Sequence, residues 1–326
     1  MSNISLGIDV SKLELSVALL KDNKSIKLKF SNDIVGFKKL YKWLCANKAT
    51  DIKMCMEATG HYSLGIADFL YQKKCDVYII NPFCIKSFAN GKLSRNKTDE
   101  ADAVIIAQYI KQTQAAPYKP APKIIREIRE LDKTLEAMKI NRAQVKTRLA
   151  DGSYLPQKII SIWKTTLEHL DLQIKNIETS LHDLISAKSE LKQDYENLQT
   201  IPGISSTTAI TILALVPDIS EFINARQLAA FAGLTPKQRT SGRSIRGKTK
   251  LSKMGSIRLR KALFFPAISA KQYNPVVKKF CDNLRNKSKC KMVVIGAAMR
   301  KLMHIIFAIF KHKVVFNTNL NSITSL

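Results

Sequence analysis

The chain has 326 residues, 45% of them hydrophobic, which is enough for two or more domains with apolar cores. Its formal net charge of +27 is rare for a soluble enzyme, because like charges destabilise a compact state unless a polyanion neutralises them. No run approaches the ~18 apolar residues of a membrane helix, and the amino end lacks a signal-peptide pattern. We therefore expect a cytoplasmic, nucleoid-associated bacterial protein that binds nucleic acid and no membrane.

The first ~115 residues alternate between strand and helix patterns, as in an α/β domain. The order is three strands, helix, strand, helix, strand, helix, which is that of the ribonuclease H-like (RuvC-like) fold. We assign residues 1–118 to this domain. The expected strands cover 4–10, 13–20, 26–30, 52–57 and 77–80, and the expected helices lie near 37–44 and over 64–73 and 98–112.

A helical, charge-rich arm is expected over residues 119–199, after prolines at 117, 120 and 122. A helix covers about 124–149. From Ile160 to Leu198, apolar or aromatic residues alternate three and four apart, and Lys188 alone breaks the seam. This heptad pattern predicts a coiled coil. A dimerisation arm and an intramolecular helical hairpin fit the spacing equally well.

The third region, residues 200–326, is expected to be mainly helical, with helices over 206–215, 225–231, 257–270 and 292–310. Residues 233–253 lack helical periodicity and are rich in Gly, Ser, Thr and Lys. After Glu221 the one acidic residue is Asp282, so this part of the chain is strongly basic. A basic stretch of this composition favours phosphate contacts. Its cations are Lys237, Arg239, Arg243, Arg246, Lys248, Lys250, Lys253, Arg258, Arg260 and Lys261.

The six cysteines form no C-x-x-C pair and do not cluster with the five histidines, so a zinc site is not expected. We interpret them as reduced thiols that mostly fill the core. They are Cys45, Cys55, Cys75, Cys84, Cys281 and Cys290.

Four carboxylates are the candidate metal ligands. Asp9 lies in an apolar strand, where a charge is costly unless it serves a site or binds a cation. Glu57 ends the fourth strand, which in this fold is the parallel neighbour of the first. Asp99 and Asp102 share one helix face. If they converge, they repel one another unless divalent cations intervene, and all-oxygen ligands favour magnesium or manganese. A pair of ions stabilises the attacking and leaving oxygens of phosphoryl transfer.

Simpler interpretations exist for three of these acids. Asp102 is also explained as a first-turn acid favoured by the helix dipole, and Asp99 as a capping residue. Glu57 is also explained as a surface residue at a strand end. Asp9 is the hardest to explain in this way.

The stretch around Ser241 places hydroxyl groups among arginines and glycines. Glycine lets backbone approach a phosphate, arginine neutralises a phosphodiester, and a serine there can attack phosphorus to form a phosphoserine. The spacing alone favours a phosphate-contact loop without a covalent role, and Thr240 and Ser244 are equally available. Similarly, residues 201–204 before a helix fit either a DNA-gripping hairpin or a plain helix cap.

Several motifs in order resemble the DEDD-type insertion-sequence transposases of the one-ten family, whose known members use a bridge RNA. The resemblance covers nearly the whole chain. Ser205 departs from it, because many relatives have glycine there. The matching segments are residues 7–12 (GIDVSK), 57–62 (EATGHY), 96–103 (NKTDEADA), 201–204 (IPGI), 229–236 (AAFAGLTP), 241–242 (SG), 246–247 (RG) and 252–255 (SKMG).

The resemblance implies that a RuvC-like domain binds magnesium through Asp9, Glu57, Asp99 and Asp102, and that Ser241 is the nucleophile. It also implies a composite active site made by two subunits, with donor and target DNA chosen by a bridge RNA. A homo-oligomer, dimer or tetramer, follows. We expect nucleic-acid contacts from Lys97, Arg239, Arg243, Arg246, Lys248 and Lys253.

Two other functions compete with a recombinase. A RuvC-like nuclease or junction resolvase needs the four acids but not Ser241. A non-catalytic nucleic-acid-binding relative needs neither, yet every expected catalytic position is filled.

Overall fold

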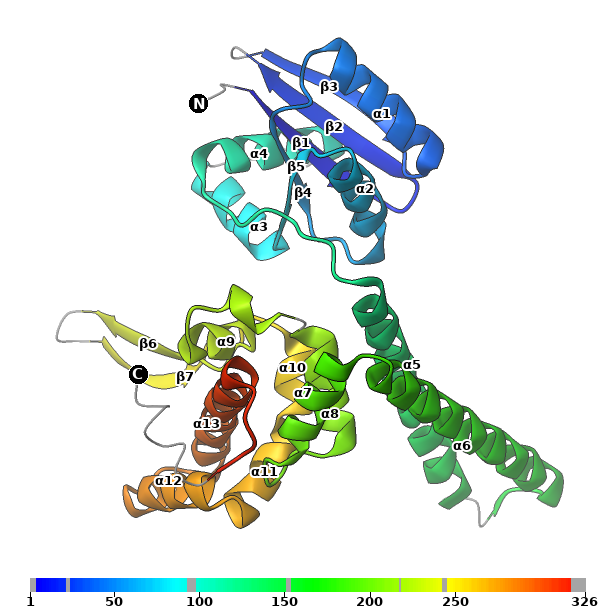
Figure 1. Ribbon diagram of the computed structural model, residues 1–326, viewed down its shortest axis with the longest axis vertical. Helices are drawn as coiled ribbons and strands as arrows, with labels where there is room; N and C mark the ends of the chain where they lie inside the picture. Colours follow the sequence, from blue (N-terminus) through cyan, green and yellow to red (C-terminus); the bar gives the residue numbers. More distant parts are fainter. Residues whose placement is uncertain are drawn as a thin grey trace. The chain divides into compact units, whose positions relative to one another are not determined.

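The computed structural model describes residues 4–21, 24–92, 98–150, 154–216, 218–241 and 245–317, without the side chains of 238–241 and 245–248. The chain divides into two compact units, residues 1–120 and 121–326. The boundary falls at the prolines that the sequence marks as the end of the first domain (Figure 1).

The first unit is built on a five-stranded mixed sheet with the strand order β3-β2-β1-β4-β5. The first three strands form an antiparallel meander, and β4 and β5 run parallel to β1. The expected parallel pairing of the first and fourth strands is therefore confirmed. The strands are β1 (Ser5–Val10), β2 (Glu14–Lys21), β3 (Lys24–Ser31), β4 (Lys53–Glu57) and β5 (Asp76–Ile80).

The two faces of the sheet carry different helices. Alternate residues of β1, beginning with Leu6, are buried against α1 (Ile34–Ala46) and α2 (His61–Gln72). On the other face, α3 (Pro82–Gly91) and α4 (Asp99–Gln112) pack over β4 and β5. Burial on both faces explains why the central strands read as nearly continuous apolar runs.

The α3 helix was not predicted. The sequence Asn81-Pro82 indicated the end of a strand, but it also begins this helix. The Asn81 side chain accepts a hydrogen bond from the Phe83 N–H at 2.9 Å, and Pro82 occupies the first turn. An amide cap followed by proline is a favoured helix start, because proline lacks the N–H that would go unpaired there.

Small residues let α4 pack directly on β1. A Cβ atom at Gly7 would lie 2.0 Å from the Ala103 carbonyl oxygen and 2.5 Å from the Ala107 nitrogen. The buried Ser5 hydroxyl donates a hydrogen bond to the Ala107 carbonyl at 2.9 Å. Glycine at position 7 is therefore required by close approach of the helix backbone.

The second unit begins with a helical hairpin of α5 (Lys123–Ala150) and α6 (Gln157–Ser186). Its contacts run in opposite directions along the two helices, so the pair is antiparallel: Lys139–Glu178 at 2.7 Å, Arg142–Asp171 at 3.1 Å, and Arg148 over the Trp163 ring at 4.7 Å. The expected partnership of the two helices is confirmed within one chain. The heptad seam is not one helix, since α6 ends at Ser186 and α7 (Ser189–Gln199) follows Lys188.

The rest of the second unit is a helical core with one β-hairpin. Helix α13 (Lys291–His312) is long and apolar enough to cross a bilayer by those measures, but most of it is buried in this core. The expected 257–270 helix divides in two at Leu263. The sequence predicted neither the next helix, Pro275–Asn286, nor the β-hairpin. The elements are α8 (Ser206–Leu215), the short helix η2 (Ile219–Glu221), α9 (Ala225–Phe231), β6 (Pro236–Ser241), β7 (Ile245–Leu251), α10 (Ile257–Ala262), α11 (Phe264–Tyr273) and α12 (Pro275–Asn286).

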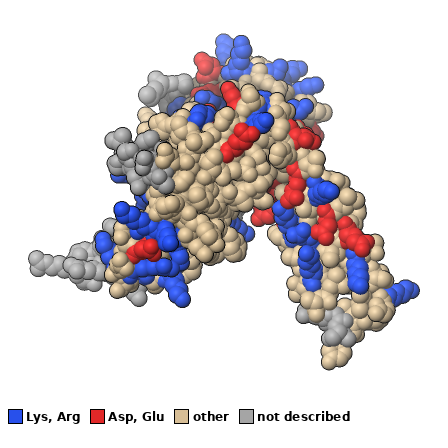
Figure 2. Space-filling view, turned by 60° about the horizontal axis from the view of Figure 1, so that its bottom comes forward, with Lys and Arg blue, Asp and Glu red and all other residues tan. Residues whose placement is uncertain are grey.

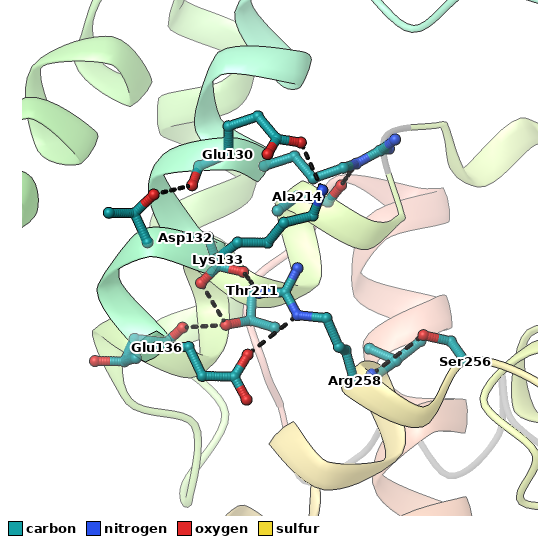
Figure 3. A network of polar contacts seen from close by, with 12 residues as sticks. Glu130, Asp132, Lys133, Glu136, Thr211, Ala214, Ser256 and Arg258 are labelled. Atoms are coloured by element: carbon teal, nitrogen blue, oxygen red, sulfur yellow. Dashed lines mark hydrogen bonds and ion pairs between the residues drawn. The ribbon is translucent and has the colours of Figure 1, made fainter. Parts of the chain in front are cut away.

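A buried ion pair joins the hairpin helix α5 to this core (Figure 3). Asp132 is only 3% exposed. Its carboxylate accepts hydrogen bonds from Arg258 at 2.7 Å and from the Thr211 hydroxyl at 2.9 Å. Arg258 also donates to Glu136 at 3.1 Å. Since removing one partner of a buried pair leaves an unpaired charge, this network fixes α5 against α8 and α10.

Replacing Gly7 with alanine tests the contact between β1 and α4. We expect Gly7→Ala to lower the free energy of unfolding by about 1–3 kcal/mol, because the added methyl group displaces α4. Urea unfolding followed by circular dichroism measures the change. The matched control is Gly91→Ala, where a Cβ atom would meet nothing within 4 Å. Equal stability of the two variants would contradict the packing argument.

Candidate active site

Asp9 and Glu57 lie side by side at the ends of two parallel strands. Ile8 of β1 pairs with Met56 of β4, so the next residue of each strand is level with the other. Both carboxylates lie at the carboxyl end of the sheet, where the strands stop. This edge is where α/β proteins commonly place their ligands.

Helix α4 adds its own acids at the same edge. Going from Gly7 to Asp9 advances about 6.6 Å along β1, and going from Ala103 back to Asp99 covers about 6 Å along α4. Because Gly7 lies against Ala103, Asp9 is brought level with Asp99. The Thr98 hydroxyl caps the helix by accepting from the Ala101 N–H at 3.2 Å. The interpretation of Asp99 as the cap is therefore wrong.

The other three carboxylates are close enough to affect the ionisation of Asp9. Burial is the largest cause that raises the pKa of Asp9, which reaches about 6. The negative charges of Asp99, Asp102 and Glu57 add to this, in that order, while the Val10 N–H lowers it. The four acids therefore occupy one neighbourhood. Among the described residues, no three His, Cys, Asp or Glu side chains are near enough to hold a metal ion as they stand.

A lysine pair on β3 borders the acids, and the sequence gave no sign of it. Lys29 pairs with Glu14 at 2.8 Å, and Lys27 lies 3.8 Å from Glu100. The pKa of Lys29 is raised, chiefly by its hydrogen bond with Glu14 and less by Asp99 and Glu100. Strand register could have shown this, since Asp9 pairs with Ser16 and Ser16 pairs with Lys29 across the sheet.

Ser241 lies in the other unit, at the end of β6, where its backbone pairs with Ile245 of β7. Thr240 and Arg246 form the preceding pair, and Arg239 is opposite Gly247. The side chains of Arg239, Ser241, Arg246 and Lys248 lie outside the described residues, as do Lys97 and Arg243 altogether. The structure thus shows the hairpin but not the contacts of its candidate groups.

Gly255 and Gly233 fix the base of the hairpin. The sequence pattern alone does not reveal this packing role. Gly255 has φ 139°, and a Cβ atom there would lie 2.3 Å from the Phe231 carbonyl oxygen. The Ser252 N–H donates to the Thr235 carbonyl at 2.8 Å. Lys253, an expected DNA contact, is exposed, has φ 56°, and donates its N–H to the Gly233 carbonyl at 3.2 Å. These contacts tie both ends of the hairpin to α9.

The segment before α8 supplies the cap of that helix. Ser205, the departure from the family pattern, is the helix cap and accepts from the Thr208 N–H at 3.4 Å. Gly203 has φ 106°, and a Cβ atom there would lie 2.8 Å from the Ala270 nitrogen. The glycine is thus explained by packing against α11.

The cysteines divide evenly between core and surface. Cys55, Cys75 and Cys281 are buried, and Cys45, Cys84 and Cys290 are exposed. Half of them therefore fill the core, rather than most of them.

Comparisons with known proteins match the parts of the chain that contain these motifs. A family described as Transposase, of the DEDD and IS110 type, matches residues 6–152, and the family described as Transposase IS116/IS110/IS902 matches residues 195–282. The "Pilin gene-inverting protein" of Moraxella bovis is 30% identical over 325 residues, which is 98% of this chain and 100% of that protein. The chain belongs to the IS116/IS110/IS902 transposase family.

A transposase from another organism matches a shorter part. The "Transposase for insertion sequence element IS1111A" of Coxiella burnetii is 33% identical over 34% of this chain and 29% of its own length. Transposases act on DNA by cutting and rejoining it, so the charge of this IS110-family transposase is explained by a DNA partner. The expected family and the expected class of enzyme are confirmed.

Replacing Asp9 with asparagine should stabilise the metal-free protein at neutral pH. Folded Asp9 keeps its proton up to about pH 6, whereas in the unfolded chain it ionises near its usual pKa of 3.8. Folding therefore takes up a proton between these values, and stability falls as the pH rises through that window. At pH 7.5 in EDTA we expect Asp9→Asn to gain about 1 kcal/mol, allowing for solvent screening. Thermal unfolding measures the gain.

The pH dependence distinguishes this effect from a general one. The gain should become small at pH 3.5, where Asp9 is mostly protonated in both states. The matched control, Asp51→Asn, changes an exposed aspartate away from the cluster and should show neither the gain nor its loss. An Asp9→Asn variant that is less stable than the parent at both pH values would sink the argument.

Proposed function

We propose that this transposase performs metal-dependent strand exchange on DNA, with an acid cluster in a ribonuclease H-like first unit and a serine nucleophile in the second. One observation carries the proposal: after burial, the charges of three acids on two other elements, α4 and β4, raise the pKa of Asp9. The strand order β3-β2-β1-β4-β5, with helices on both faces, supports a RuvC-like fold for residues 1–118. The arm over 119–199 and the serine-bearing region over 200–326 complete the proposed domains.

The four acids suit a divalent cation in chemistry and charge. Their donors are all oxygen, which favours magnesium or manganese. Their mutual repulsion, visible in the raised pKa of Asp9, is what a cation would relieve. Bound there, such ions would stabilise the charge that develops on the phosphate oxygens. Asp9, Glu57, Asp99 and Asp102 would hold them, and the rigid strands beneath Asp9 and Glu57 would set their positions.

The covalent step belongs to Ser241. Its hydroxyl oxygen would attack the phosphorus of one DNA strand and a P–O bond to the sugar would break, while the proton that the serine hydroxyl gives up would pass, through water, to the departing sugar oxygen. A sugar hydroxyl of the new partner strand would then reverse the step and free the serine. The phosphodiester is conserved throughout, so rejoining needs no other energy source. Arg239, Arg243, Arg246, Lys248, Lys253 and Lys97 would contact the nucleic-acid backbone.

The assembly and the guide are also part of the proposal. A bridge RNA would choose donor and target by base pairing, and the subunits would form a dimer or tetramer at the nucleoid. The α5–α6 hairpin would arrange the subunits as a coiled-coil arm. Apolar side chains remain exposed on both helices: Ile140 at 52%, Ile162 at 53% and Leu172 at 55%. Exposed apolar residues on an arm that already has an internal partner favour further helix packing.

Removing the Ser241 hydroxyl tests the covalent step. We expect Ser241→Ala to lose the protein–DNA adduct and to slow strand exchange by at least about 1000-fold, because no other group replaces the nucleophile. Denaturing electrophoresis with labelled duplex carrying the element's ends detects the adduct, and mass spectrometry maps it. Thr240→Ala and Ser244→Ala are the matched controls and should keep the adduct.

The same assay separates the alternatives. EDTA should abolish the adduct in the parent protein, and Mg²⁺ or Mn²⁺ should restore it. A nuclease or junction resolvase would keep cutting DNA after Ser241→Ala and would form no adduct in any variant. Loss of the adduct from Thr240→Ala or Ser244→Ala instead would move the nucleophile to that residue.

Mixing two inactive variants tests whether subunits share active sites. Asp9→Asn lacks one acid and Ser241→Ala lacks the nucleophile, so each alone should be inactive. In a composite site, a mixed oligomer contains one pairing with both intact halves and should regain about a quarter to a half of the activity. Strand-exchange assays after co-refolding or co-expression measure this. If every mixture stays inactive while mixed oligomers form, each subunit acts alone.

A further inference from the structure

A second basic surface lies far along the sequence from the serine hairpin. It is formed by α12 and the segment that leads into α13, and it is called here the α12 surface. Among these residues one acid occurs, Asp282, and it pairs with Arg285 at 3.4 Å. Figure 2 shows Lys and Arg side chains gathered at the lower left of the view around a single acidic group. The exposed cations are Lys278, Lys279, Arg285, Lys287, Lys289 and Lys291.

The helix is held firmly against the core, so the backbone positions that carry its cations are fixed. Val277 and Cys281 are fully buried in the core of the second unit. The Asn274 side chain, also buried, caps the helix by accepting from the N–H groups of Val276 at 3.1 Å and Val277 at 3.2 Å. Lys278 and Arg285 are exposed and lie on one side of the helix, two turns apart, which is about 10.5 Å.

The start of α13 adds to the positive potential. Its first turn contains no acidic residue, and the first helical residue is Lys291. Free N–H groups and the helix dipole favour anions at such an end. Among the described residues, the ion pair that the α12 surface makes is Asp282–Arg285, so its other cations have no carboxylate to neutralise them. A polyanion is the partner that fits this charge.

We propose that the α12 surface binds the phosphate backbone of duplex DNA, independently of sequence and apart from the serine hairpin. The partner is DNA because the family cuts and rejoins DNA. The duplex form follows from what the surface lacks: the exposed residues between 278 and 291 include no aromatic ring. Proteins that hold single strands stack bases on aromatic side chains, whereas lysines and arginines contact a duplex backbone. The surface holds DNA without selecting its sequence.

A charge-removal variant tests this surface. The triple variant Lys278→Gln, Lys279→Gln, Arg285→Gln removes three cations from α12. The probe is a fluorescent 30-base-pair DNA duplex of scrambled sequence, titrated in EDTA at several salt concentrations. We expect the slope of log affinity against log salt to fall by about 3, roughly one for each lost phosphate contact. Affinity at 0.15 M salt should fall at least 10-fold.

The matched control removes the same charge elsewhere. Lys38→Gln, Lys39→Gln, Lys42→Gln changes three exposed lysines on helix α1 of the first unit. This control should leave the slope within about one of the parent, since those lysines would not touch the duplex. Equal losses in the two variants would mean a general charge effect and would overturn the proposal. Thermal unfolding checks that both variants fold; if the helix variant does not, Lys287→Gln, Lys289→Gln, Lys291→Gln replaces it.

An RNA arm decides the kind of nucleic acid. The same titration uses an RNA duplex of identical sequence. A larger loss on RNA than on DNA would overturn the assignment to DNA. Binding is measured in EDTA, without cleavage, so the outcome does not depend on the metal or on Ser241. The choice of DNA as the partner rests only on the family's action on DNA. The binding surface and the proposed chemistry can therefore fail separately.

Discussion

The close contact between α4 and β1 is the constraint on which the acid cluster depends. Carboxylates from separate elements repel one another, so they come together only where backbone packing holds them close. Here the missing side chain at Gly7 admits the backbone of α4, and the Ser5 hydroxyl fixes its height on the strand. The first turn of the helix, with its acids, is then carried to the end of β1. Gly7 carries no functional group, yet the close contact that it allows sets the positions of the candidate metal ligands.

The cluster is costly to the folded protein without a cation. Burial and like charges hold the pKa of Asp9 near 6, so its ionisation at neutral pH works against folding. The continuous apolar packing on the other face of the sheet, where Leu6 and Ile8 are fully buried, supplies stability that offsets this cost. Strain concentrated at one edge of a well-packed sheet is typical of a functional site, where stability is lost in exchange for activity.

The sequence predicted most of the first unit because burial imposes its pattern directly. Runs such as residues 4–10 are apolar since both faces of the sheet are covered, and Asp9 stands out within them. It did not predict α3 or α12, because Asn81-Pro82 and Asn274-Pro275 resemble chain breaks although each begins a helix. The roles of Gly7 and Lys29 depend on register between strands and helices, which local pattern does not contain. Likewise, local pattern could not choose between Ser241 and its neighbours Thr240 and Ser244, because all three carry a hydroxyl group and the pattern distinguishes them only by their position in the chain.

The distribution of charge indicates a division of labour between the two units. An acid cluster repels phosphates, so the edge of the sheet that carries it is poorly suited to attract DNA, although residues 1–120 as a whole hold 18 Lys and Arg against 11 acids. The sequence after Glu221 holds 22 Lys and Arg residues against one acid. Attraction to the backbone must then come chiefly from the second unit, through long-range charge that salt screens. The chemistry proposed at Asp9 would depend instead on partly buried, short-range interactions that salt screens less. Binding and the proposed metal chemistry in this transposase are therefore expected to respond differently to ionic strength, because most of the cations that attract DNA are separate in the sequence from the acid cluster.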